Sequence, residues 1–190
     1  RCTGCKTCEL VCKDYHDLGP DILFRRIYDF EGGSWEKTPE GAWNKTAFNY
    51  HLAVSCNHCD SPACVENCPT GAMTKDEATG IVSIDQETCI GCKTCISACP
   101  YGAPSYDEAS STTFKCDGCY DRRQRGELPA CVAACPGANL ALDDMESLQG
   151  AHAADIVSDE SSGTKPNFVI TVDAALAEEP DDIVAENHTA

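Results

Sequence analysis

The segment CIGCKTCISACPYGAP, residues 89–104, places four cysteines within eleven residues and follows the last of them with Pro100. Its spacing is C-x2-C-x2-C-x3-C. The 16 cysteines of the 190-residue chain fall into four groups of four, which we call boxes one to four. Box one has the same spacing, whereas boxes two and four are spaced x2, x4, x3 and x2, x11, x3. Every box begins with C-x2-C and ends with C-x3-C, and a proline follows the last cysteine in boxes two, three and four. The boxes are, in order, Cys2, Cys5, Cys8, Cys12; Cys56, Cys59, Cys64, Cys68; Cys89, Cys92, Cys95, Cys99; and Cys116, Cys119, Cys131, Cys135. The sequence therefore contains an internal repeat.

The rest of the composition leaves room for only a small hydrophobic core, in one or two domains. Hydrophobic residues make up 42% of the chain, but this figure includes the cysteines, and aromatic residues are only 7%. The net charge of −17 makes nucleic acid and anionic lipid poor partners. No stretch of about 18 uncharged apolar residues occurs, so no membrane span is predicted. The sequence shows no signal peptide and begins one residue before a cysteine, and we expect the natural protein to begin earlier.

Three kinds of site use many cysteines: disulfides, structural zinc and iron–sulfur clusters. Disulfides suit short secreted chains, but they give no reason for four near-copies of one spacing. Zinc favours isolated C-x2-C pairs, and three thiolates within seven residues are unusual for it. Iron–sulfur clusters use tight, repeated cysteine runs. The spacing therefore favours iron–sulfur clusters, with a structural zinc-binding module as the alternative from another class.

The repeat also predicts how many clusters the chain carries. Gly4, Gly91 and Gly118 stand inside C-x2-C pairs, where a residue without Cβ lets a tight loop wrap a cluster. In two-cluster ferredoxins the fourth cysteine of such a run binds the other cluster. Two boxes then exchange their last cysteines and form two clusters, so four boxes predict four clusters with sixteen ligands and no cysteine left over. Boxes two and three are adjacent and form one natural pair, which leaves boxes one and four to pair across the chain.

The fold class predicted is α+β: two ferredoxin-like [4Fe–4S] modules with an inserted strand pair. Residues 1–15 and 105–145 form one module, 56–104 form the other, 16–55 form the inserted strand hairpin, and 146–190 form a C-terminal extension. Strands are expected at 22–30, 47–54, 72–75 and 81–84 from their β-branched and aromatic residues, with a further strand at 165–172. Residues 101–115 are expected to be a loop. The acidic residues 173–190, which lack aromatic residues, are expected to be a mobile tail.

Five segments of the sequence carry a resemblance to a known family. They are RCTGCKTCELVCKDYHDL (1–18), FRRIYDFEGGSW (24–35), SCNHCDSPACVENCPTGAM (55–73), CIGCKTCISACPYGAP (89–104) and KCDGCYDRR (115–123). Together they resemble the four-cluster electron-transfer subunit of dimethyl sulfoxide reductase and of related molybdopterin oxidoreductases. The resemblance covers residues 1 to about 140, and TKPNFVI extends it to about 170. The family has a short strand before its first box, which this sequence lacks.

The resemblance implies a ligand set for each of four [4Fe–4S] clusters. In some relatives a Trp replaces the second cysteine of box three and gives a three-iron cluster, but here that position is Cys92. The implied sets are Cys2, Cys5, Cys8 and Cys135 (cluster 1); Cys12, Cys116, Cys119 and Cys131 (cluster 2); Cys56, Cys59, Cys64 and Cys99 (cluster 3); and Cys68, Cys89, Cys92 and Cys95 (cluster 4).

The resemblance also implies a non-catalytic subunit that conducts electrons in anaerobic respiration. Cluster 1 would face a molybdopterin catalytic subunit that reduces an S-oxide or N-oxide, and cluster 4 would face a membrane anchor that oxidises menaquinol. The alternative is the same relay in a formate dehydrogenase or a tetrathionate, polysulfide or nitrate reductase. The subunit would lie at the membrane through its anchor, on the extracytoplasmic face, with the cytoplasmic face as the alternative.

Several residues outside the boxes have simpler expected roles. His58, inside CNHC, is expected near a cluster or facing solvent rather than as a ligand. Arg25 and Arg26 are expected in a salt bridge, with docking of a partner as the alternative. Lysines beside cysteines, such as Lys115, could raise cluster potentials but are expected to be exposed. Pro100 and Tyr101 are candidates for a contact at the quinol end. Trp35 is a candidate for a subunit contact or for a cap on the small core.

Overall fold

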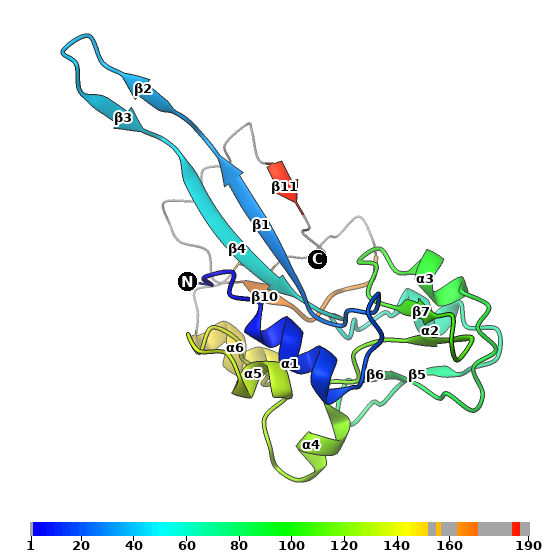
Figure 1. The fold of residues 1–190 in the computed structure, drawn as a ribbon. Coiled ribbons are helices and arrows are strands. Elements are labelled where there is room, and N and C mark those ends of the chain that lie inside the picture. The colour runs from blue at the N-terminus through cyan, green and yellow to red at the C-terminus, as the bar shows by residue number, and fades with distance from the viewer. Residues whose placement is uncertain (1, 152–154, 157–162, 171–183, 187–190) are drawn as a thin grey trace.

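The computed structural model describes residues 2–151, 155–156, 163–170 and 184–186. Within these ranges the chain forms short helices and antiparallel strand pairs, in agreement with an α+β class (Figure 1). The helices are α1 (Thr7–Tyr15), α2 (Ala63–Glu66), α3 (Thr94–Ala98), α4 (Tyr120–Gln124), α5 (Ala130–Ala133) and α6 (Met145–Ala151). None of the described helices is long and apolar enough to cross a membrane.

A long antiparallel hairpin, which we call the arm (residues 26–54), projects away from the other elements (Figure 1). Its base pairs β1 (Arg26–Gly32) with β4 (Phe48–Val54), in a register that runs from Arg26 opposite Val54 to Gly32 opposite Phe48. Beyond a bend at residues 33–34 the arm continues as β2 (Trp35–Lys37) paired with β3 (Trp43–Lys45). Trp35 is 59% exposed, so it does not cap a core.

The predicted strand at 47–54 agrees with β4, but the one at 22–30 begins later than expected, at Arg26. The reason is that Ile22 and Phe24 are buried against Cys12, below the base of the arm. Their apolar side chains therefore belong to the packing around a cysteine and not to a strand face.

The remaining elements form what we call the body, the described residues 2–25 and 55–141. Two hairpins belong to it: β5 (Met73–Lys75) with β6 (Val82–Ile84), as predicted, and β7 (Ser105–Asp107) with β8 (Thr112–Phe114). The prediction of a loop over 101–115 is therefore wrong. The turn is stabilised by Asp107, whose carboxylate accepts hydrogen bonds from the Ser110 N–H at 3.0 Å and the Ser110 hydroxyl at 2.7 Å.

Cysteine side chains are part of each small core cluster. Cys8 and Cys131 pack with Ile27 and Ala53, whereas Cys95 packs with Met73 and Val82. Helix α1 contacts α5, and α2 contacts α3, so segments far apart in the sequence meet at the boxes (Figure 1). The body is therefore organised around its thiol groups.

The C-terminal extension is described only in part. Within the predicted strand 165–172, β10 (Val169–Ile170) pairs with β9 (Asp155–Ile156), while residues 171–172 lie outside the described residues. Of the expected tail at 173–190, only 184–186 are described. These three residues form β11 (Val184–Glu186), which pairs with β1 at Asp29–Glu31, so the expected lack of structure is wrong for them.

Candidate metal centres

The first half of every box forms the same left-handed loop. The third residue of each box has a positive φ: Gly4 (65°), His58 (44°), Gly91 (65°) and Gly118 (67°). Such a φ turns the backbone so that successive N–H groups point to the inside of the loop, where a ligand with negative charge would lie. Glycine adopts this conformation at little cost, which explains its presence at three of the four positions.

Box three shows why a side chain is not tolerated there. A Cβ on Gly91 would collide with the carbonyl oxygen of Ser111, in the turn between β7 and β8. Gly80 has a similar φ of +69° but open space around it. The hairpin that was not expected from the sequence therefore covers the loop of box three.

Alanine at these two glycines should have very different effects. Gly80→Ala should lower the free energy of unfolding by roughly 1–2 kcal/mol, the cost of a left-handed alanine. Gly91→Ala should lower it by more than about 3 kcal/mol, because the β7–β8 turn must also move away from the box. Apparent thermal midpoints of the two iron-loaded variants test this. Equal midpoints would show that the hairpin does not pack against box three.

The thiols of boxes one and four meet around Cys12. This cysteine lies on α1, is only 5% exposed, and faces box four. Burial raises the pKa of the Cys12 thiol, and the neighbouring negative charges of Cys116, Cys131 and Cys119 raise it further. These four sulfurs are those that the resemblance assigns to cluster 2.

Cys8 lies one turn earlier on α1. It packs against Cys131 of α5 and so connects box one to that helix. Burial raises its pKa to about 11; Arg25 opposes this effect, while the charges of Cys131 and Cys2 add to it. Cys135 follows α5 and accepts a hydrogen bond from the Asn139 N–H, at 3.3 Å from its sulfur. No described charge interaction links Cys135 directly to Cys2, Cys5 or Cys8, so its place in cluster 1 stays a prediction.

Boxes two and three meet in two places. Burial raises the pKa of Cys64 to about 12, and the charges of Cys56, Cys99 and Cys59 act in the same direction. This group matches the four cysteines predicted for cluster 3.

The second meeting point involves the last cysteine of box two. Burial raises the pKa of Cys95, and the charges of Cys92 and Cys68 add to it. Cys68 and Cys95 also pack in one core cluster with Met73 and Val82. Three of the four cysteines predicted for cluster 4 are thus brought together, and Cys89 lies in the same loop as Cys92.

Hydrogen-bond donors face several of the sulfurs. Backbone N–H groups of Met73 and Gly118 each lie 3.4 Å from a sulfur, of Cys68 and Cys116 respectively. In boxes one and three, a threonine hydroxyl contacts the second cysteine: Thr7 lies 3.4 Å from Cys5 and Thr94 lies 3.3 Å from Cys92. These hydroxyl groups lower the pKa of both thiols, which favours the thiolates that bind metal.

Two cations lie close to cysteines. Arg25 donates from Nη2 to the Cys131 sulfur at 3.4 Å and from Nη1 to the Ala53 carbonyl at 3.2 Å. Lys115 is only 3% exposed and donates to the carbonyl oxygens of Val82 and Cys116, so the prediction of an exposed Lys115 is wrong. Among the described residues neither one pairs with a carboxylate, and the salt bridge of Arg25 stays a prediction.

His58 occupies the position that glycine holds in the other boxes. Its Nδ1 accepts the Val82 N–H at 3.0 Å, which ties box two to β6. Burial lowers the pKa of His58 to about 3, and the nearby charges of Lys115, Arg123 and Lys75 lower it further. The imidazole is therefore neutral at physiological pH and supports the loop through Nδ1, while the prediction that it is not a ligand stays a prediction.

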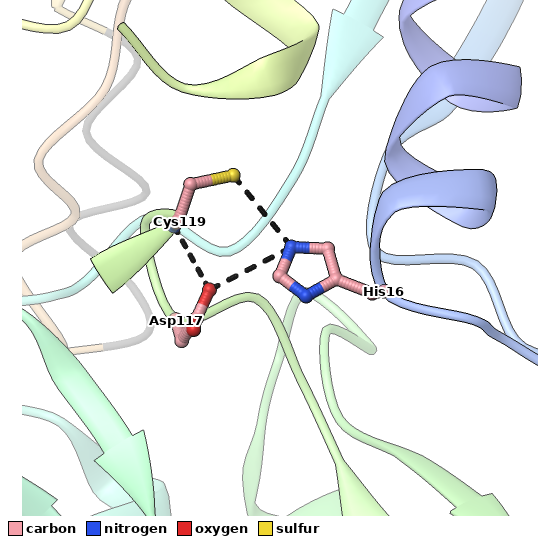
Figure 2. A group of neighbouring side chains, drawn as sticks. All are labelled: His16, Asp117 and Cys119. Carbon is pink, nitrogen blue, oxygen red and sulfur yellow. Dashed lines mark hydrogen bonds and ion pairs between the residues drawn. The ribbon is translucent and has the colours of Figure 1, made fainter. Parts of the chain in front are cut away.

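A histidine that the sequence did not single out also approaches a box. His16 follows α1, and its Nε2 lies 3.6 Å from the Cys119 sulfur and 3.8 Å from the Asp117 carboxylate (Figure 2). The three ligand atoms lie within 4.8 Å of one another, as in a small metal site. The Cys119 sulfur is predicted to bind a cluster, and with that prediction His16 would be a hydrogen-bond partner of the sulfur. Nothing in the sequence signals this contact, because 103 positions separate the two residues.

A C-terminal segment, residues 164–167, clamps box two. The Asp60 and Ser61 N–H groups donate to the carbonyls of Lys165 and Thr164 at 2.9 and 3.0 Å. Asn167 donates from its side chain to the His58 carbonyl at 2.9 Å. The TKPNF segment therefore completes the surroundings of box two.

Pro100 is exposed and Tyr101 is half-buried, directly after the last cysteine of box three. The Tyr101 hydroxyl lies 2.9 Å from the Thr164 hydroxyl, which connects box three to the clamp on box two. The contact gives Tyr101 a structural role and leaves its predicted contact at the quinol end as a prediction.

The residues around the boxes fit iron–sulfur clusters. Several thiols are desolvated and carry raised pKa values, so the thiolate forms need a bound cation to be stable there. Within the described part of the chain, the buried Arg25 Nε has no hydrogen-bond partner, and the buried Thr113 hydroxyl interacts with the Cys95 thiol. An N–H and a hydroxyl beside sulfur ligands match the donors that hydrogen-bond to cluster sulfurs.

Comparisons with protein families agree with this chemistry. A family model described as a 4Fe-4S dicluster domain matches residues 47–145, and one described as a 4Fe-4S binding domain matches residues 1–15. The first matched region contains boxes two, three and four, and the second contains box one.

Three relatives illustrate which proteins this one is similar to. It is 50% identical over 177 residues to the B subunit of the anaerobic dimethyl sulfoxide reductase of Escherichia coli (strain K12), covering 92% of the present sequence and 85% of the relative. It is 48% identical over 173 residues to the subunit of the same name from Haemophilus influenzae, covering 90% and 84%. It is 38% identical over 176 residues to the B subunit of the polysulfide reductase of Wolinella succinogenes, covering 89% and 88%.

Proposed function

Because this protein belongs to the iron–sulfur electron-transfer subunits of the dimethyl sulfoxide reductase family, we propose that it relays electrons from a quinol-oxidising membrane anchor to a molybdopterin catalytic subunit. It is a non-catalytic [4Fe–4S] subunit of an oxidoreductase complex of anaerobic respiration. The observation that carries the proposal is the closure of sixteen cysteines into four boxes of four. We propose dimethyl sulfoxide, or a related S-oxide or N-oxide, as the final acceptor.

We propose four ligand sets that exchange the last cysteine between paired boxes. The sets are Cys2, Cys5, Cys8, Cys135; Cys12, Cys116, Cys119, Cys131; Cys56, Cys59, Cys64, Cys99; and Cys68, Cys89, Cys92, Cys95. The mutual charge effects of Cys12 with box four and of Cys64 with Cys99 support the exchange. The contacts of α1 with α5 and of α2 with α3 support two ferredoxin-like modules, 1–15 with 105–145 and 56–104, with 16–55 as the inserted hairpin.

The residues of the protein set the conditions for this transfer. A bound [4Fe–4S] cluster supplies reversible one-electron chemistry, whose potential depends on hydrogen bonds to sulfur, local charge and solvent exposure. The left-handed loops, with Gly4, Gly91 and Gly118, direct N–H groups inward, and Thr7 and Thr94 stabilise thiolates at matching positions of two boxes. Ile22, Phe24 and Met73 keep water from the buried cysteines.

We propose that the end of the molecule with Cys2 and Cys5 meets the catalytic subunit, and that the end with Cys92 meets the anchor. Cys5 and Cys92 are exposed, as ligands near two docking surfaces need to be. Pro100 and Tyr101 follow box three and would lie near the quinol end. Unchanged quinol oxidation in both Tyr101→Phe and Tyr101→Ala would contradict that contact.

We place the subunit on the extracytoplasmic side of the membrane, attached through its anchor, with the cytoplasmic face as the alternative. Protease treatment of spheroplasts distinguishes the two, because only an extracytoplasmic subunit is degraded before lysis.

A second candidate is the same relay in a complex with another acceptor. It is favoured by the relatives named as the B subunit of polysulfide reductase and the electron transfer subunit of thiosulfate reductase, each 38% identical. Turnover of the purified complex with S-oxides, polysulfide or thiosulfate as acceptors distinguishes the two candidates.

Metal analysis tests the relay directly. We expect about sixteen iron and sixteen acid-labile sulfide per molecule purified without oxygen. Low-temperature EPR of the dithionite-reduced protein should show a broad signal from magnetically coupled clusters. Zinc in place of iron would support the structural zinc module, and about eight iron in fully assembled protein would reject four clusters.

A further inference from the structure

Arg25 and Lys115 differ from four other cations of the body in what surrounds them. Lys75, Lys93, Arg122 and Arg125 each pair with a carboxylate of Asp60, Glu108 or Glu127. Within the described residues, Arg25 and Lys115 have no such partner, although the sequence carries 31 acidic residues. A buried cation is normally paired, because an uncompensated charge away from water is costly. The negative charge that balances these two must therefore come from another source.

The Arg25 guanidinium lies between boxes one and four. Its Nη2 is 3.4 Å from the Cys131 sulfur, and its buried Nε has no partner among the described residues. A guanidinium keeps its positive charge in proteins, and this one points its Nη2 at a cysteine sulfur. The negative charge that Arg25 faces is thus the charge of the cysteines.

Lys115 lies between boxes two and four. Its Nζ is fixed by the carbonyl oxygens of Val82 and Cys116, so that it cannot turn to solvent. Lys115 directly precedes Cys116 of box four, and its positive charge also acts on Cys64 of box two. One lysine therefore acts on two of the proposed ligand sets.

We propose that Arg25 and Lys115 compensate the charge of the buried clusters and raise the reduction potentials of the clusters whose cysteine ligands they face. The inference rests on the proposed ligand sets. Reduction adds one electron, and so one negative charge, to a cluster, and a fixed cation nearby stabilises the reduced form more than the oxidised form. Arg25 acts on clusters 1 and 2 through Cys8 and Cys131, and Lys115 acts on clusters 2 and 3 through Cys116 and Cys64. Cluster 4 faces neither cation.

The test is a potentiometric titration of the intact complex with dithionite, followed by EPR. The charge-removing variants are Arg25→Gln and Lys115→Met, and the charge-keeping variants are Arg25→Lys and Lys115→Arg. Arg26→Gln is the matched control, because the neighbouring Arg26 approaches the Ser105 hydroxyl at 3.5 Å and no sulfur. Iron content is measured for every variant.

We expect each charge-removing variant to weaken the reduction of its clusters at least tenfold, which is about 59 mV for one electron. Cluster 2 should respond to both variants, cluster 3 only to Lys115→Met, and cluster 4 to neither. Full iron content with unchanged potentials would overturn the inference and leave the electron relay intact, whereas fewer than four clusters in the unmodified protein would reject the relay itself.

Iron loss is also informative. If the charge-removing variants lose iron while the charge-keeping ones retain it, compensation of cluster charge is supported. If both kinds lose iron equally, the two side chains act by packing alone, and the inference is wrong.

Discussion

Removal of the iron should unfold the body. Anaerobic chelation should abolish most of the far-UV circular dichroism of its helices and expose residues 2–25 and 55–141 to protease. The physical reason is the small core: the largest fully buried side chains are Ile27, Met73, Val82 and Thr113, and each core cluster contains cysteines. When metal ligands tie separate segments together, the free energy of metal binding becomes free energy of folding.

The control for chelation is the same chelator saturated with iron beforehand, which should leave the spectrum unchanged. The arm has its own backbone pairing from Arg26 to Val54, but a two-stranded hairpin is marginally stable alone, so we expect it to fray as well. A body that keeps its helical signal and protease resistance after complete loss of iron would contradict the prediction.

Serine variants of box four should reveal which boxes share clusters. Cys135→Ser and Cys131→Ser should each leave about twelve iron where the affected cluster is lost, or about fifteen where it is kept as a three-iron cluster. If the last cysteines are exchanged as proposed, Cys5→Ser combined with Cys135→Ser removes two ligands of one cluster and leaves about twelve iron. Cys12→Ser combined with Cys135→Ser removes one ligand from each of two clusters and leaves about eight iron where both are lost, or about fourteen with two three-iron clusters.

Iron and sulfide analysis of the two double variants measures this difference directly. Ala134→Ser is the matched control, because it places a hydroxyl beside Cys135 without removing a ligand, and it should retain about sixteen iron. The reverse result, with about eight iron in the Cys5 and Cys135 pair and about twelve in the Cys12 and Cys135 pair, would assign Cys135 to the cluster of Cys12.

The cofactor and part of the fold could be predicted from sequence because their signals are local. Ligand spacing repeats within each box, and glycine marks three of the four left-handed positions. The strands near 47–54, 72–75 and 81–84 are predicted from their β-branched and aromatic residues, which lie within a few positions, and β4, β5 and β6 lie there. The fourth left-handed position is occupied by His58 and not by glycine. It can therefore be predicted only from its place in the repeat and not from its residue type.

What the sequence could not predict depends on contacts between distant segments. Lys115 is buried through its contacts with Val82, 33 positions away, and Arg25 meets Cys131 across 106 positions. The clamp on box two by residues 164–167 joins backbone hydrogen bonds, which any sequence can form, to the Asn167 side chain, which lies 109 positions from His58. The β7–β8 hairpin is different: Tyr106, Thr112 and Phe114 are β-prone and flank a turn with Asp107, so its signal was present.

The contact of α1 with α5 also sets a schedule for biosynthesis. Residues 56–99 contain all the cysteines of boxes two and three, and these residues leave the ribosome within one short interval. Helix α1, by contrast, must wait until residue 133 has been made, more than 100 residues later, which takes about 5–25 s at typical elongation rates. During that wait the thiols of box one lack the cysteines of box four with which we propose that they share clusters, so the clusters of this module can be completed only late in synthesis.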